Sequence, residues 1–382
     1  MQEFDGPRPL RREEWAAAVR LERLCFSGIL GETDDADWET SYTSPKRGGW
    51  QVIAHCGQPV SLIGVFHNKV GVYGSPLRIA SIGGVCTHPD YRGQGLASRL
   101  LDYCIRRSIA ESARLMLISG IRGLYTRAGN VTAQEFEYVT LRPGQLRLEA
   151  GDFTVRPATA ADAAPCARIY QAEPVHFVRR VSKFADHFTR REEFPKGEDW
   201  IVESDGRPLA YCFTRLPWGY AREQGVREVI EYAGSRVALV ASLAQVLADL
   251  NLRELRLAVP WQDTDLLWLL RQQGLAGDRI PLPEHTMRII NFPGLMADLR
   301  PYVQARLPAS LRRGLRFEQQ DDRCAIVRGH ERLELDGAAM TRLVMGIPAG
   351  QTTKAVTTSP VLDEIIAALF PLPSFLPGLN YQ

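Results

Sequence analysis

The stretch that decides the fold is Ser81–Ala97, which reads SIGGVCTHPDYRGQGLA. An apolar run ends in a short polar turn, and a glycine-rich loop then opens a helix. Glycines let a backbone approach an anion closely, and the free N–H groups in the first turn of a helix point at it. Arg92 adds a fixed positive charge beside Gly93 and Gly95. The stretch therefore predicts a loop that binds a diphosphate.

Two other phosphate-binding loops do not fit this stretch. A Walker A loop is excluded because no Gly-Lys-Ser/Thr sequence follows the glycines. The dinucleotide-binding fingerprint is incomplete, because Ser98 stands where its third glycine would be. A strand, turn and helix with a purely structural role remains the alternative.

The same residues resemble the coenzyme motif of the GNAT N-acetyltransferases, in which Arg/Gln-x-x-Gly-x-Gly/Ala follows a strand. Here the motif reads Arg92-x-x-Gly95-x-Ala97. The resemblance implies that acetyl-CoA is the co-substrate. In that family the strand before the loop offers backbone groups to the pantetheine arm, and the loop amides hold the pyrophosphate. The residues implied to bind it are Val85, Cys86, Thr87, Arg92, Gly93, Gln94, Gly95, Leu96, Ala97 and Ser98.

Acetyl transfer to an amine requires a polarised thioester, a neutral amine, a proton for the departing thiolate and alignment of both substrates. Gly83 and Gly84 suit a β-bulge in the strand. The backbone N–H of Val85 is the candidate group for polarising the thioester oxygen. Cys86 is not expected to act as a nucleophile, because no histidine stands at a recognisable spacing and direct transfer needs no acyl-cysteine.

Tyr125 is the candidate proton donor. The segment Leu124–Gly129 resembles the aromatic-Tyr-x-Arg/Lys-x-Gly motif of the family, whose tyrosine hydroxyl reaches the coenzyme sulfur. A phenol with a pKa of about 10 remains protonated at neutral pH and can donate to a forming thiolate. Asn130 departs from the pattern, which commonly has phenylalanine there. A tyrosine that only packs remains the alternative.

The sequence says little about the part of the site that binds the acceptor. The acidic stretch Gly31–Glu39 lies where GNAT folds place their acceptor-binding loop, and it could attract a cationic amine. A solvated acidic loop is the simpler interpretation. Phe26 and Trp38 are candidates for lining the acceptor pocket. The acceptor itself is expected to be a small-molecule amine, with a polyamine, an aminoglycoside or a lysine side chain left open.

Length and composition describe an ordinary soluble globular chain. It has 382 residues, 45% of them hydrophobic and 24% charged, and a net charge of +2. We therefore expect neither a nucleic-acid nor a membrane partner. The seven cysteines are scattered without a C-x-x-C pair, so neither a disulfide scaffold nor a metal site is expected. The N-terminus lacks a basic segment followed by an apolar one, so we expect a cytoplasmic protein.

The first domain reads as an α/β sandwich around one sheet. An amphipathic helix is predicted over Leu10–Phe26, with Trp15, Val19 and Leu24 on its apolar side. Strands are predicted at 50–55, 60–67, 79–87 and 115–118, and helices from residue 96 and near residue 124.

An internal repeat follows about 150 residues later. Trp50-x-Val52 and the turn at 57–60 are echoed by Trp200-x-Val202 and the turn at 206–209. Tyr232–Ala238 replaces the arginine-glycine loop, so the second copy is interpreted as a GNAT fold without coenzyme binding. An unrelated α/β domain remains open. The last region reads as a small α+β domain, with strands at 324–327 and 332–335 and helices at 296–307, 336–345 and 363–370.

This layout resembles the Eis-like (enhanced intracellular survival) acetyltransferases, in which a catalytic GNAT domain precedes a degenerate GNAT domain and a sterol-carrier-protein-like domain. The resemblance implies an α/β (α+β) fold with two mixed-sheet GNAT domains at 1–150 and 151–287 and a sterol-carrier-like domain at 288–382. It also implies a homo-oligomer, in this family a hexamer. The base would be the α-carboxylate of Gln382, carried by the proline-rich tail Phe370–Tyr381.

The expected function is acetyl-CoA-dependent transfer of an acetyl group to a primary amine. A non-catalytic acyl-CoA- or lipid-binding protein is the alternative. A tandem-GNAT peptidoglycan aminoacyltransferase is disfavoured, because that class uses charged tRNA and normally lacks a coenzyme loop.

Overall fold

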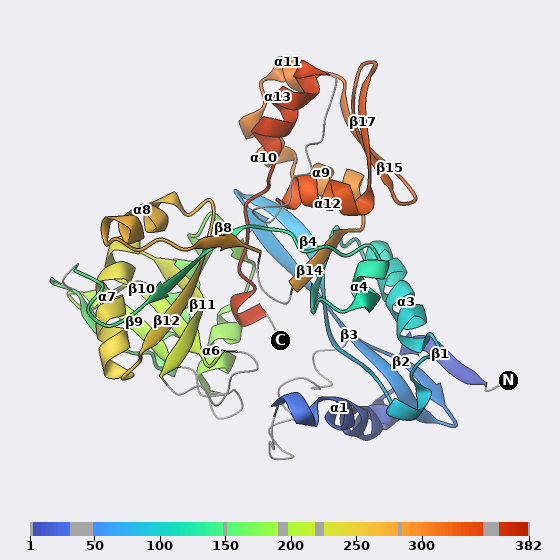
Figure 1. Ribbon diagram of the computed structural model, residues 1–382, viewed down its shortest axis with the longest axis horizontal. Coiled ribbons are helices and arrows are strands. Elements are labelled where there is room, and N and C mark those ends of the chain that lie inside the picture. The colour runs from blue at the N-terminus through green and yellow to red at the C-terminus, as the bar shows by residue number, and fades with distance from the viewer. Residues whose placement is uncertain are drawn as a thin grey trace. The chain divides into compact units, whose positions relative to one another are not determined.

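The computed structural model describes residues 3–30, 49–147, 151–189, 198–217, 225–281, 285–346 and 359–380. Its contacts divide the chain into two units. The first unit is Met1–Gln134 with Pro283–Leu372, and the second is Glu135–Leu282 with Pro373–Gln382. Both units combine helices with mixed sheets, so the predicted α/β class is confirmed (Figure 1).

A mixed sheet with the strand order β1–β2–β3–β4–β5–β14 forms the base of the first unit (Figure 1). Its strands are β1 (Phe4–Pro9), β2 (Trp50–His55), β3 (Gln58–Val72), β4 (Ser75–Thr87), β5 (Leu115–Ser119) and β14 (His285–Ile289). The first four are antiparallel neighbours. β5 runs parallel to β4, and β14 runs antiparallel to β5. The four predicted strands are therefore present, and β3 and β4 are longer than expected.

Apolar side chains alternate along these strands and give the sheet two buried faces. The neighbours Val52 and Ile53 belong to two different core clusters. α3 (Leu96–Ala110) packs on the face of Ile53, and α1 (Trp15–Leu30) packs on the face of Val52. The short helix α4 (Gly123–Arg127) follows β5 and joins the face of α3.

The buried side of α1 differs in one respect from the predicted apolar side. Val19 is buried as expected, but Leu24 is 53% exposed. Glu22 is only 2% exposed, and it shares a helix face with the buried Ala18 four residues earlier. A carboxylate therefore occupies a position on the sheet-facing side of this helix.

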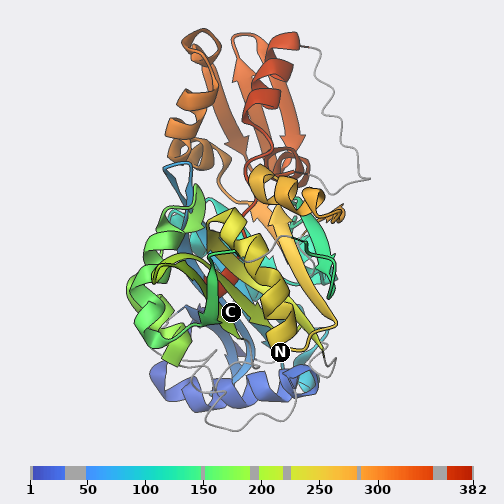
Figure 2. The same ribbon diagram turned by 90° about the vertical axis from the view of Figure 1, so that its left-hand side faces the viewer.

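The described part of the first unit also contains a three-stranded antiparallel sheet and five helices. They are β15 (Leu315–Gln320), β16 (Arg323–Arg328), β17 (Glu331–Asp336), α9 (Phe292–Asp298), α10 (Arg300–Arg306), α11 (Ala309–Arg312), α12 (Gly337–Met345) and α13 (Pro360–Leu369). Figure 2 shows the orange strands beside the orange and red helices. The single helix predicted over 296–307 is interrupted at Leu299, because Pro301 has no N–H to donate and disfavours helical geometry before it.

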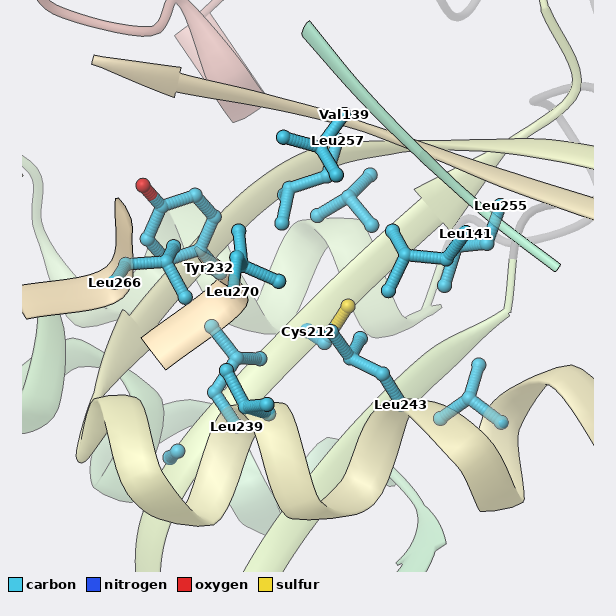
Figure 3. Close-up of a cluster of buried hydrophobic side chains, with 14 of the residues drawn as sticks. Val139, Leu141, Cys212, Tyr232, Leu239, Leu243, Leu255, Leu257, Leu266 and Leu270 are labelled. Carbon is cyan, nitrogen blue, oxygen red and sulfur yellow. The ribbon is translucent and has the colours of Figure 1, made fainter. Parts of the chain in front are cut away.

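The second unit is built on a seven-stranded sheet in the order β13–β6–β12–β11–β10–β9–β7. Its elements are β6 (Phe136–Leu141), β7 (Thr154–Pro157), α5 (Ala163–Gln171), β8 (Val175–Phe177), α6 (Val181–Thr189), β9 (Asp199–Ser204), β10 (Arg207–Arg215), β11 (Val226–Gly234), α7 (Arg236–Asp249), β12 (Glu254–Pro260), α8 (Thr264–Gln272) and β13 (Asp278–Ile280). Figure 3 shows the apolar side chains that fill the space between α7, α8 and the sheet, among them Cys212, Leu239 and Leu266.

Each large sheet contains a strand that is distant from its other strands in sequence. β6 follows α4 of the first unit but pairs with β12 in the second sheet. β14 follows β13 but pairs with β5 in the first sheet. These pairings explain why the two units differ from the predicted boundaries at residues 150 and 287. The division into three domains, with a sterol-carrier-like last domain, stays a prediction.

The proline-rich tail is buried, as its apolar residues suggested. Phe370, Leu372, Phe375 and Leu379 are each at most 8% exposed. In the first unit, the N–H of Leu372 donates to the carbonyl of Val344 at 2.7 Å. Pro373–Asn380 belongs to the second unit.

Two sets of hydrogen bonds fix the end of the tail in the second unit. Ser374 exchanges hydrogen bonds with the side-chain amide of Gln262, at 2.6 and 3.1 Å. The N–H of Leu379 donates to Glu231 Oε2 at 3.1 Å. Glu231 also pairs with Arg179 at 2.7 Å, and both side chains are at most 3% exposed. Breaking such a buried pair is costly, because one charge is left uncompensated, so the tail has a rigid anchor up to Asn380.

Candidate functional site

The loop between β4 and α3 has the geometry of an anion-binding site. After a 3₁₀ turn at Pro89–Tyr91, Gly93 and Gly95 have φ angles of 78° and 73°. This left-handed region favours glycine. No heavy atom lies within 4 Å of where a Cβ would stand on either residue, so the approach to the backbone is open. Gly95 caps α3 without a side-chain hydrogen bond, which leaves the first-turn N–H groups to a ligand.

Neighbouring side chains hold this loop in place. Leu96 is 2% exposed and fixes the start of α3 in the core, whereas Arg92, Gln94 and Ser98 are exposed. Arg92 Nε donates to the carbonyl of Thr87 at 3.2 Å. The hydroxyl of Tyr91 and Nδ1 of His55 are hydrogen-bonded at 2.9 Å. The loop thus carries a charged guanidinium close to the end of β4.

β4 separates from β5 just before the loop. The parallel pairing of the two strands covers only Ile79–Ile82 of β4. The register between β3 and β4 shifts at Leu62–Gly64, opposite Gly83, so the predicted bulge is confirmed. Along the described strands, the edge of Val85–Thr87 that faces away from β3 has no strand partner. Its backbone groups can pair with an extended ligand, as a pantetheine arm requires.

Tyr125 lies in the same apolar cluster as Val85 and Leu96. It is 3% exposed, and a Cβ on Gly120 would come within 2.7 Å of its ring. The carbonyl of Tyr125 accepts from both the backbone N–H and Nδ2 of Asn130, at 3.0 and 3.1 Å. Asn130 therefore satisfies a carbonyl near the C-terminal end of α4. The residue that departs from the family motif thus has a structural role.

The predicted acceptor residues are only partly described. Phe26 packs against the cluster on the α1 face of the sheet, which contains Cys86. Trp38, the acidic stretch Gly31–Glu39 and Gln382 lie outside the described residues. The predicted coenzyme residues and Tyr125 gather around one end of the first sheet, while the roles of Trp38 and Gln382 stay predictions.

Sequence reasoning missed Cys25, which lies beside the coenzyme strand. Its thiol donates to the carbonyl of Thr87 at 3.5 Å and packs against the cluster of Cys86. A hydrogen bond from Cys86, with a smaller contribution from Arg92, lowers the pKa of Cys25 to about 6, although partial burial opposes the shift. The same hydrogen bond and burial raise the pKa of Cys86 well above its usual value. No local pattern singled it out, because its neighbours Cys86 and Thr87 lie far from it along the chain.

We expect Cys25 to react with iodoacetamide at unusually low pH. The thiolate is the reactive form, so its alkylation rate should rise through about pH 6 and then level off. Free cysteine, with a pKa of about 8.5, is the reference and should level off only at higher pH. Mass spectrometry of the labelled peptide measures the rate. A profile for Cys25 that follows free cysteine would contradict the arrangement with Cys86 and Arg92.

The second unit contains no counterpart of the loop in its described part. β11 also shows a register shift against β10, at Phe213–Thr214, and pairs with β12 only from Val226 to Val229. It then enters α7 directly through Ser235, whose Oγ accepts from the N–H of Ala238 at 3.3 Å. Arg236 is held by Glu173 and Asp263, at 2.7 and 2.9 Å. The first turn of α7 is therefore occupied by the chain's own side chains.

No group of three or more His, Cys, Asp or Glu side chains among the described residues could hold a metal ion. None of the described helices has the length and apolar character needed to cross a membrane.

Comparisons with known proteins agree with this geometry. Residues 7–130 match the family model described as "Acetyltransferase (GNAT) domain". This segment contains the loop, the bulged strand and Tyr125, so the chain carries a GNAT domain and the protein is an acetyltransferase. No curated protein sequence matches the chain.

Solved structures share the fold over nearly the whole chain. A GCN5-related N-acetyltransferase from Kribbella flavida has a TM-score of 0.66 at 15% identity, covering 97% of this chain and 96% of that one. A GCN5-related N-acetyltransferase from Anabaena variabilis has a TM-score of 0.65 at 13% identity, covering 98% of each chain. Eis1 from Mycobacterium abscessus has a TM-score of 0.62 at 16% identity, covering 97% of this chain and 96% of that one. These likenesses concern the fold alone.

Proposed function

We propose that the protein transfers the acetyl group of acetyl-CoA to a primary amine by direct attack. The observation that carries this proposal is the open glycine loop at the end of a bulged strand with a free edge. The amides of Gly93–Ser98 and the Arg92 guanidinium hold the pyrophosphate, and the Val85–Thr87 backbone holds the pantetheine arm. The bound co-substrate supplies an activated acetyl group in thioester form.

Three groups of the chain carry out the transfer in this proposal. The N–H of Val85 polarises the thioester oxygen, which is the usual way to stabilise a developing oxyanion. Tyr125 donates a proton to the leaving thiolate. The α-carboxylate of Gln382 removes the proton of the incoming amine. This last role rests on the resemblance to the Eis-like acetyltransferases.

Thiol release from acetyl-CoA in the presence of primary amines tests the function. We expect release that depends on both the amine and the intact loop. Binding of acyl-CoA or of a lipid without thiol release would favour the non-catalytic alternative, which the loop and Tyr125 speak against. An Eis-like layout, with a degenerate second GNAT domain and a homo-oligomer, is part of the proposal and rests on the sequence resemblance and the missing loop at α7.

Adding a few residues after Gln382 is expected to slow acetylation without weakening acetyl-CoA binding. The extension displaces the terminal carboxylate, and loss of a general base typically costs about 10²–10⁴-fold in rate. Replacing only the side chain, as in Gln382→Ala, is the matched control and should be tolerated. Steady-state kinetics and calorimetry measure both properties. An extended protein with a normal rate would rule out the terminal carboxylate as the base.

A further inference from the structure

Cys25 of α1 and Cys86 of β4 place two free thiols side by side at the end of the coenzyme strand. Their side chains share a hydrogen bond, and both lie where the helix packs on the sheet. The Cys25 thiol also donates to the carbonyl of Thr87 at 3.5 Å, and Arg92 Nε donates to the same carbonyl at 3.2 Å. The two sulfurs are therefore already in contact, which is the first requirement for a disulfide.

The two thiols differ in reactivity. The hydrogen bond from Cys86, followed by smaller contributions from Arg92 and His88, lowers the pKa of Cys25 to about 6 against the effect of its partial burial. Cys86 is 5% exposed, and its pKa is raised well above the usual value by the same hydrogen bond and by burial. A thiolate that solvent can reach, beside a second cysteine that can resolve it, is typical of redox-sensing pairs. Cys25 is therefore the attacking group, and Cys86 is the resolving group.

The other cysteines differ from Cys25. Cys56 is exposed in the turn between β2 and β3, so it serves as a control for accessibility alone. Burial raises the pKa of the remaining four, Cys104, Cys166, Cys212 and Cys324. A buried, protonated thiol reacts slowly with oxidants, because the thiolate is the nucleophile. Oxidation is therefore expected to begin at Cys25.

We propose that Cys25 and Cys86 form an oxidation site, at which a hydroperoxide converts the two thiols into a disulfide that suppresses acetyl transfer. With hydrogen peroxide, the Cys25 thiolate attacks one oxygen and the O–O bond breaks. The other oxygen takes up a proton and leaves as water, and Cys25 becomes a sulfenic acid. The Cys86 sulfur then attacks the Cys25 sulfur, the S–O bond breaks, and the Cys86 proton leaves with the hydroxyl as a second water. Two electrons pass from the two sulfurs to the peroxide.

The disulfide changes the strand that holds the co-substrate. It brings the two sulfurs to about 2.05 Å, which is much closer than two hydrogen-bonded sulfurs, so α1 and β4 must be drawn together. Cys86 stands between Val85 and Thr87, whose backbone holds the pantetheine arm in the proposed function. A displacement of about 1 Å in such a site costs about 100-fold in rate. The loss of activity rests on the proposed acetyltransferase function, whereas formation of the disulfide does not.

The first experiment tests the disulfide without measuring activity. The full-length protein is treated with hydrogen peroxide at neutral pH and digested with trypsin under non-reducing conditions. The two cysteines fall on separate peptides, 24–46 and 79–92, which should be recovered as one linked species that dithiothreitol separates. In Cys86→Ser the reaction should stop at the Cys25 sulfenic acid, which dimedone labels. Absence of the linked species in the oxidised wild type, or linkage of Cys25 to another cysteine, would overturn the proposal.

The second experiment tests the effect on the reaction, after the peroxide has been removed by desalting. Acetylation by the wild type should fall by about 100-fold and return on addition of dithiothreitol. Cys25→Ser, or Cys25→Ala if the serine variant does not fold, should keep the untreated rate and resist peroxide. Cys56→Ser is the matched control and should be inactivated like the wild type.

The remaining outcomes separate this proposal from the function on which it rests. A linked species with an unchanged rate, or a Cys25→Ser variant that peroxide inactivates as fast as the wild type, would overturn the regulatory role. Reduced wild-type protein that binds acetyl-CoA but transfers no acetyl group would instead contradict the proposed function, and peptide mapping would still decide whether the disulfide forms.

Discussion

Replacing Gly95 with valine is expected to abolish measurable acetyl-CoA binding. Gly95 has a φ of 73°, a conformation that is a genuine outlier for a β-branched residue. Valine forces the loop to another conformation and places methyl groups where the pyrophosphate must approach the amides. Losing one or two charge-assisted hydrogen bonds, at about 1.5–3 kcal/mol each, raises Kd by on the order of 100-fold or more. Calorimetry should give one site per chain for the wild type and no detectable heat for the variant.

Gly74→Val is the matched control for this experiment. Gly74 lies in the turn between β3 and β4, has a φ of 80°, and has no heavy atom within 4 Å of a Cβ position. Both variants therefore carry a similar backbone strain, of about 1–3 kcal/mol, on open surface. We expect a similar decrease in Tm for both but normal acetyl-CoA affinity for Gly74→Val. Equal affinities in the two variants would show that the loop does not hold the co-substrate.

Replacing Tyr125 with phenylalanine should lower kcat by about 10²–10⁴-fold, the usual contribution of a general acid. The ring remains in its apolar cluster against Gly120, so folding and acetyl-CoA affinity should change little. Only the proton for the leaving thiolate is lost. Thiol release measured from pH 6 to 9 gives kcat and its pH dependence.

Tyr302→Phe controls for the removal of a buried hydroxyl from the same unit. Tyr302 is 2% exposed and donates to the carbonyl of Leu369 at 3.0 Å. Its loss should lower Tm and leave kcat unchanged. If Tyr125→Phe keeps full turnover at every pH, water protonates the thiolate, and Tyr125 is a packing residue.

Local patterns were enough to predict the bulge in β4 and the glycine loop that follows it. The bulge at Gly83 and the loop at Gly93–Gly95 depend on glycine positions and on the order of strand, turn and helix, all of which lie within one short stretch. The buried side of α1 could not be predicted in the same way. Glu22 lies inside and Leu24 outside, contrary to their polarity, because the residues facing the helix decide which side is buried.

Long-range strand pairing also escaped prediction. β6 and β14 are short strands, and neither pairs with a strand next to it in sequence. The partners β12 and β5 lie far from them along the chain, so local sequence cannot identify them. The units follow these pairings, and the domain boundaries at 150 and 287 stay predictions from the repeat in the sequence.

The placement of β14 has a consequence for the protein during its synthesis. β5 ends at Ser119, and its partner β14 begins at His285, so the ribosome must add more than 160 residues between them. At about 5–20 residues per second, the nascent chain carries an open strand edge for roughly 10–30 s. This edge is Leu-Met-Leu-Ile-Ser, and an unpaired apolar edge is a template for aggregation. The yield of folded enzyme should therefore depend on translation speed between these two strands.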